Sequence, residues 1–95
     1  MQTGVHVGTG IYGISNRTTL TFDFEPQLIL IKHPTESDTA LLVRGSTRAQ
    51  FIGDYSQTEG LYLTWDGASV SFYNTFSARL QFNVQNFRYI LLAFG

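Results

Sequence analysis

The stretch Leu61–Tyr73, LYLTWDGASVSFY, constrains the fold more than any other part of this sequence. Its centre, Asp66-Gly67, is a strong signal for a two-residue turn, because a type I′ turn needs positive φ at both central positions. With these two residues as the turn, apolar residues of the two strands face one another, in the pairs Trp65–Ala68, Leu63–Val70 and Leu61–Phe72. The other face carries Tyr62, Thr64, Ser69, Ser71 and Tyr73. A shift of one residue would mix the two sets, so the pattern predicts a hairpin with a core face, which includes Trp65, and a hydroxyl-rich face.

The rest of the chain reads as further short strands separated by turn residues, with no helical periodicity over a useful length. Residues 18–24 alternate between apolar and polar side chains, and Pro26 ends that strand because proline cannot donate to a sheet ladder. The other expected strands lie at about 4–12, 27–33, 40–44, 51–52, 80–84 and 87–94. Strands of this length and spacing are typical of an all-β fold, an antiparallel β-sandwich of about seven short strands. The 95 residues suit one domain, spanning 1–95.

Three of the expected strands, 27–33, 40–44 and 87–94, are apolar on both faces. The outer face of an antiparallel sandwich is normally exposed to water, so another layer should cover this one. A second copy of the chain is the simplest cover for a domain this small. The sequence therefore predicts an oligomer.

The composition argues against several classes of partner. The net charge is −1 and only 14% of the residues are charged, whereas a nucleic-acid-binding domain carries a basic face. No apolar run approaches the roughly 20 residues of a membrane span, and no signal peptide is visible. We therefore expect neither nucleic-acid binding nor membrane insertion.

Catalytic and metal-binding patterns are weak. The chain has no cysteine and two histidines, His6 and His33, and it lacks the G-x-S-x-G motif of a nucleophile elbow. Glycoside cleavage needs two carboxylates across a cleft, and the sequence offers three acid pairs: Asp23/Glu25, Glu36/Asp38 and Asp54/Glu59. Most of these residues fall in expected turns, where solvated carboxylates are usual. No metal-ligand spacing occurs. We expect no catalytic activity, no bound metal and no cofactor.

Aromatic and polar side chains favour a different kind of site. Glycan-binding sites combine an aromatic surface with planar polar groups that bond to hydroxyls. The residues best suited to this are Arg44, Tyr55, Tyr73, Asn74 and Arg79, in or beside the loops 16–18, 44–50, 54–59 and 74–79. The face of Tyr62 and Tyr73 has two open interpretations, since tyrosine is also favoured at subunit interfaces.

The order of segments resembles a known family. The run GTGIYGISNRTTLTFDFEP, residues 8–26, continues into the apolar QLILIK strand. It is similar to the start of a small β-domain found near the C-terminal ends of phage tail-fibre and minor structural proteins. The second half, WDGASVSFYNTFSARLQFN followed by FRYILLAFG, resembles the end of that domain. The F-x-F-x-P-x-apolar pattern at 22–28 is also similar to H-type lectins, which are trimeric sandwiches that bind sugars between protomers. Where the family usually has glycine before its last strand, this chain has Gln85-Asn86.

The resemblance implies a homotrimeric, non-catalytic domain of a virion, at a tail fibre or tail tip or in a prophage-encoded equivalent. It would recognise a carbohydrate on the host surface, with its own subunits as its other partners. The alternative is a structural module that trimerises or caps a fibre without a ligand of its own. In either case, residues 1–95 are expected to be a domain excised from a longer fibre protein.

Overall fold

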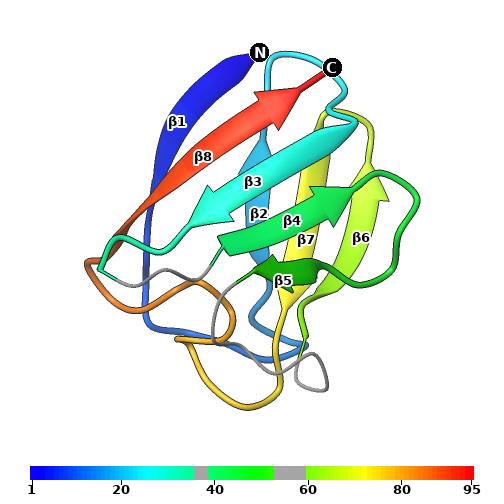
Figure 1. Cartoon of the computed structure of the whole chain (residues 1–95). Helices are drawn as coiled ribbons and strands as arrows, with labels where there is room; N and C mark the ends of the chain where they lie inside the picture. The colour runs from blue at the N-terminus through cyan, green and yellow to red at the C-terminus, as the bar shows by residue number, and fades with distance from the viewer. Residues whose placement is uncertain (36–38, 53–59) are drawn as a thin grey trace.

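The chain forms a two-layered antiparallel β-sandwich, which confirms the predicted fold class (Figure 1). The computed structural model describes residues 1–35, 39–52 and 60–95. One sheet has five strands in the order β1-β8-β3-β4-β5, and the other has three in the order β2-β7-β6. The strands are β1 (Gln2–Val7), β2 (Thr18–Thr21), β3 (Leu28–Lys32), β4 (Thr39–Val43), β5 (Gln50–Ile52), β6 (Tyr62–Asp66), β7 (Ser69–Tyr73) and β8 (Arg88–Phe94). The segment around Arg48 bridges to Tyr62, so it extends the smaller sheet beyond β6.

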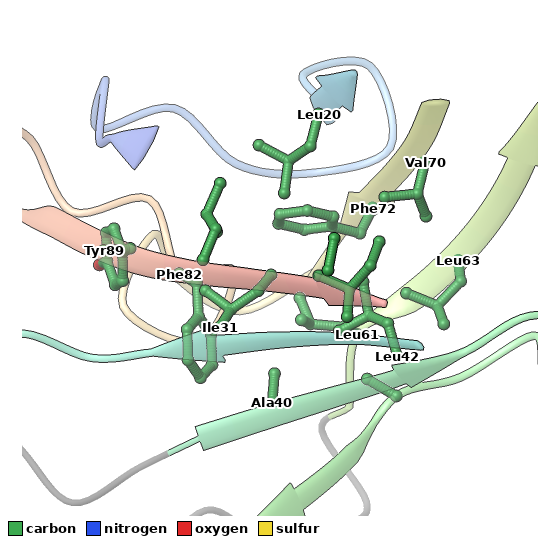
Figure 2. Close-up of a cluster of buried hydrophobic side chains, with 14 of the residues drawn as sticks. Leu20, Ile31, Ala40, Leu42, Leu61, Leu63, Val70, Phe72, Phe82 and Tyr89 are labelled. Carbon is green, nitrogen blue, oxygen red and sulfur yellow. The ribbon is translucent and has the colours of Figure 1, made fainter. Parts of the chain in front are cut away.

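The core lies between the two sheets and is made of alternate residues from each strand (Figure 2). Ile29 and Ile31 of β3 and Leu42 of β4 point inward from the larger sheet and are completely or almost completely buried. Val70 and Phe72 of β7 meet them from the smaller sheet. This alternation explains why the strands form here, since burial of apolar side chains is the main favourable term in folding.

The central hairpin forms, but its turn differs from the predicted one. Asp66 pairs with Ser69, and Trp65 pairs with Val70, so the loop is Gly67-Ala68 and not Asp66-Gly67. Gly67 has φ +58° and Ala68 is not in the left-handed region, a pattern that suits a type II′ turn with glycine at its first central position. The pairing is displaced by two residues, which leaves every side chain on its predicted face.

Trp65 lies on the core side of this hairpin, as predicted, but it is only half-buried. Its ring packs against the edge of the core. The indole Nε1 donates a hydrogen bond to the Ser46 carbonyl oxygen at 3.0 Å, and the Arg44 guanidinium lies over the ring. The tryptophan therefore packs between the core and the Arg44 and Ser46 segment.

The first strand is shorter than predicted and ends at Val7. At the next position, a Cβ on Gly8 would lie 1.9 Å from the Val84 carbonyl oxygen, so the two backbones approach more closely than any other residue allows. Gly10 then adopts φ +86°. The chain leaves the sheet at this point and crosses to the start of β2.

The predicted strand at 80–84 is absent, and turns occupy this segment. Gln81, Phe82 and Asn83 are all buried, whereas a strand of a two-layered sandwich would point every second side chain outward to solvent. Phe82 turns inward with φ +57°. Asn86 is also in the left-handed region, at φ +68°, which asparagine adopts more readily than most residues.

The outer face of the five-stranded sheet is mostly apolar, as the doubly apolar strands predicted. The core takes Ile29, Ile31, Leu42 and Leu91, and their sequence neighbours point outward. The large aliphatic residues exposed on this face are Val5, Val7, Val43, Ile52 and Ile90. Leu28, Leu30, Leu41 and Leu92 lie half-buried among them. We call this surface the aliphatic face.

Candidate ligand-binding face

The outer face of the three-stranded sheet has the opposite character, because all of its strand side chains are polar or tyrosine. The strand registers arrange them in rows that cross the sheet. One row contains Thr21, Ser69 and Asp66, and the next contains Thr19, Ser71 and Thr64. Hydroxyl–hydroxyl hydrogen bonds of 2.8 Å join Thr19 to Ser71 and Thr21 to Ser69. We call this surface the polar face.

The most distinctive row consists of Arg17, Tyr73, Tyr62 and Arg48, which we call the Arg–Tyr row. Tyr62 and Tyr73 are direct cross-strand partners. Arg17 immediately precedes β2 and continues its register opposite Tyr73, while Arg48 bridges to Tyr62 from the other side. The sheet therefore places the four side chains next to one another in this order.

The side chains of this row form a continuous stack. The two tyrosine rings lie 5.1 Å apart at an angle of 25°. The Arg17 Cζ lies 5.2 Å from the Tyr73 ring centroid, and the Arg48 Cζ lies 5.1 Å from that of Tyr62. Each tyrosine thus has one face against the other ring and one face under a guanidinium. The row therefore presents tyrosine and guanidinium groups to solvent, and each ring already contacts both a second ring and a guanidinium.

Two hydrogen bonds hold the guanidinium of Arg17 in this stack. Its Nε donates to the Ile14 carbonyl oxygen and its Nη1 donates to the Thr64 hydroxyl. A guanidinium has five N–H groups, so three remain without an acceptor among the described residues. Arg17 is exposed, and these groups are available to a ligand.

A small pocket opens beside the row, between the edge strands β1 and β2. Its volume is about 210 Å³, below the roughly 300–1,000 Å³ of a typical small-molecule site. The lining residues are His6, Thr9, Ile11, Arg17, Thr18, Thr19 and Asn83. Arg17 and Thr19 belong to both surfaces, so the pocket continues the polar face around the edge of the sheet.

The wall of this pocket is rigid because Asn83 makes four hydrogen bonds. Its side-chain oxygen accepts from the Thr9 backbone N–H and from His6 Nε2, and its nitrogen donates to the Thr9 hydroxyl and the Ile11 carbonyl oxygen. The backbone partners fix the orientation of the amide. His6 therefore carries its proton on Nε2, with Nδ1 as the acceptor in the neutral ring.

Arg44, predicted as a ligand-binding residue, is held by internal partners. Its Nε donates to the Pro26 carbonyl oxygen at 2.7 Å and its Nη2 donates to the Gly67 carbonyl oxygen at 2.6 Å. Nη1 lies 3.6 Å from a carboxylate oxygen of Glu25, and the guanidinium covers Trp65. Arg44 therefore ties the β2–β3 connection to the hairpin turn, outside the polar face.

The structure does not gather the other predicted site residues into one place. Tyr73 lies in the Arg–Tyr row, and Asn74, the next residue, is buried. Asn74 Oδ1 accepts from the backbone N–H groups of residues 76 and 77, and its Nδ2 donates to the Gly60 carbonyl oxygen. Arg79 is exposed in the turn segment that follows. Tyr55 lies outside the described residues.

Arg17 and Arg48 are the two arginines of the Arg–Tyr row, and the predicted site includes neither. Both fall in loops that the sequence singled out, 16–18 and 44–50, but nothing local indicates that they flank tyrosines. The signal is long-range: it requires the β2–β7 pairing, which places residue 17 opposite residue 73. Pairing between strands more than 50 residues apart cannot be read from local alternation.

Within the described residues, no group of three or more His, Cys, Asp or Glu side chains is arranged to hold a metal ion. The described segments include no helix long and apolar enough to cross a membrane. No known family model, curated protein or solved structure matches the chain.

Proposed function

We propose that this domain recognises a host-surface glycan, as a non-catalytic receptor-binding domain of a phage tail fibre or tail tip, or of a prophage-encoded equivalent. The observation that carries the proposal is the contrast between the two outer faces of the sandwich. One is largely aliphatic, and the other presents only hydroxyl, tyrosine and charged side chains on its strands. The first suits contact between subunits, and the second suits a ligand rich in hydroxyl groups.

The chemistry of the polar face supports a carbohydrate ligand. The hydroxyl pairs Thr19–Ser71 and Thr21–Ser69 can each donate to and accept from a sugar hydroxyl. They lie on paired strands, so their spacing is fixed by the sheet. Binding groups on rigid strands lose less conformational entropy than groups on loops when a ligand binds.

The position of the face in the molecule also supports it. Both termini lie at one end of the sandwich (Figure 1), and the Asp23 backbone N–H bonds to the Gln2 side chain at that end. Arg17 lies at the start of β2 and therefore at the opposite end. Attachment to a larger assembly through either terminus would leave the Arg–Tyr row accessible.

We further propose that the domain works as a homotrimer assembled through the aliphatic face. Contiguous exposed apolar surface commonly marks a protein–protein interaction site, and this face carries five exposed aliphatic residues. Assembly would also raise the strength of binding, because linked sites can increase avidity by roughly 10²–10⁴-fold where the geometry permits simultaneous contact.

The test is a glycan array probed with the intact oligomer. We expect binding to a restricted set of glycans, and we expect the double variant Tyr62→Ala/Tyr73→Ala to abolish it. Phe76→Ala is the matched control, because Phe76 is an exposed aromatic residue outside the row. Binding that survives the double variant would place the receptor site elsewhere.

The aliphatic face favours a second candidate, a structural module that trimerises or caps a fibre without its own ligand. This candidate shares the fold and the assembly, so only ligand binding separates the two. An intact oligomer that binds no glycan and no host cell would favour the structural module.

A further inference from the structure

The covered rings of the Arg–Tyr row indicate which class of glycan the polar face would take. A neutral sugar usually stacks its C–H surface on an open aromatic ring face. Here guanidinium groups occupy the outer faces of both tyrosines, and the rings occupy each other's inner faces. A ligand that approaches this row meets positively charged edges and tyrosine edges.

Resting on the proposed glycan recognition, we infer that the ligand is an acidic glycan, whose carboxylate or phosphate group is bound by Arg17. The guanidinium keeps three N–H groups free of acceptors among the described residues. Planar guanidinium groups match carboxylate and phosphate geometry and form short, charge-assisted hydrogen bonds with them.

The surrounding charges support an anion at this position. Within the described part of the chain, Arg17 forms no ion pair. Asp66 of the polar face stands two residues along β6 from Thr64, the hydroxyl that accepts from Arg17, which is roughly 7 Å in an extended strand. Among the described residues no carboxylate bonds to the Arg17 guanidinium, so its positive charge is available to an anionic ligand that enters from the side of the pocket.

The pocket beside Arg17 provides room for the sugar ring that carries the acid. Arg17 is one of its lining residues, and the others include hydroxyl groups and the fixed amide of Asn83. The ring would lie along Thr19 and Thr9, with its acidic group directed toward the guanidinium. Hydroxyl recognition and charge recognition would then act on adjacent parts of one ligand.

The experiment compares matched acidic and neutral glycans on one array: sialyllactose against lactose, and trigalacturonate against its methyl ester, with a glycerol-phosphate oligomer as the phosphate probe. The native oligomer should bind one or more acidic members at least about tenfold more tightly than their neutral counterparts. Added salt should weaken that binding. The carboxylate and phosphate probes distinguish the two sources of negative charge.

The variants isolate the role of Arg17. Arg17→Gln should weaken binding of the acidic glycan about tenfold or more and remove the preference over the neutral counterpart. Arg17→Lys keeps the charge without the planar group and should fall between the two. Arg88→Gln is the matched control, since Arg88 is exposed on the other sheet and its loss changes the net charge equally. Because Arg88 pairs with Val7 at the border of the aliphatic face, each variant is first shown to remain an intact oligomer.

The possible failures are distinguishable. Equal binding to acidic and neutral members, or full binding by a folded Arg17→Gln oligomer, would overturn the acidic-glycan inference and leave glycan recognition in place. Binding of acidic glycans that Arg88→Gln weakens as much as Arg17→Gln would reduce the effect to net charge and would also overturn it. An array with no bound member of either kind would overturn both proposals.

Discussion

At the scale of single residues, two arginines with the same side chain have different surroundings. Arg44 bonds to two backbone carbonyl oxygens, approaches Glu25 and covers Trp65, so its donors are used within the fold. Arg17 uses two donors and stacks on one tyrosine. From the sequence, Arg44 was the stronger candidate because it stands at the end of a strand. Which arginine retains free donors depends on the loop carbonyls that surround it, and local sequence does not place those.

The buried amide of Gln81 leads to a prediction about the stability of the domain. Gln81 is completely buried; its Oε1 accepts from the backbone N–H groups of Gly13 and Asn74, and its Nε2 donates to Asn16 and Thr18. Gln81→Ala should lower the free energy of unfolding by about 3 kcal/mol, because it leaves buried polar groups without partners.

Denaturant unfolding monitored by circular dichroism measures this effect, with Gln85→Ala as the control. Gln85 has the same side chain but is exposed, and its substitution should change stability by less than about 0.5 kcal/mol. Equal effects of the two substitutions would contradict the role assigned to Gln81.

At the scale of secondary-structure elements, alternation predicted β2 and the β6–β7 hairpin, together with the face that each of their residues takes, because these strands bury one face and expose a polar one. β3, β4 and β8 were predicted as strands from their apolar runs, and only the structure shows which of their residues enter the core. Alternation failed at 80–84, where the amides of Gln81 and Asn83 bond to the 9–18 loop and hold the segment in turns. Those partners lie more than 60 residues away in the sequence, which is beyond the reach of a periodicity argument.

The hairpin turn gives a prediction at this scale, because the predicted and observed turns respond differently to β-branched residues. In the observed register Asp66 is an extended strand residue and Gly67 has positive φ. Asp66→Thr should therefore be nearly neutral, since threonine suits a strand. Gly67→Thr should cost about 1–2 kcal/mol, because a β-branched residue is strained in the left-handed region.

The measurement is the thermal unfolding midpoint of the two single variants under identical conditions. A type I′ turn at Asp66-Gly67 would also require positive φ at Asp66, so it would make both substitutions costly. If the two substitutions lower the unfolding midpoint equally, the result would favour the Asp66-Gly67 turn predicted from the sequence over the observed Gly67-Ala68 turn.

At the scale of the whole molecule, the two outer faces divide the surface into a part suited to assembly and a part suited to a ligand. The sequence indicated this division in outline, through the doubly apolar strands and the hydroxyl-rich side of the hairpin. It did not indicate that the hydroxyl-rich side ends in a stack of two arginines and two tyrosines. The stack depends on four segments meeting in one row, and each contributes a single residue.

Assembly through the aliphatic face can be tested at one position. Ile90 is 51% exposed near the middle of that face, between Val5 of β1 and Lys32 of β3. Ile90→Glu should dissociate the oligomer, because burying a carboxylate and the neighbouring Lys32 ammonium between subunits costs more in lost hydration than their attraction returns. The folded monomer should persist, since the new carboxylate stands opposite Lys32 and opposite charges on paired strands are favourable.

Light scattering coupled to size-exclusion chromatography measures the change as a mass that falls from about three times the 10.7 kDa of one chain to that of a monomer. Thr21→Glu is the matched control, because it adds the same charge to an exposed position on the polar face and should leave the mass unchanged. A native domain that is monomeric at micromolar concentration would contradict assembly altogether. An oligomer that Thr21→Glu dissociates and Ile90→Glu does not would move the interface to the polar face, where it would compete with the proposed ligand for the Arg–Tyr row.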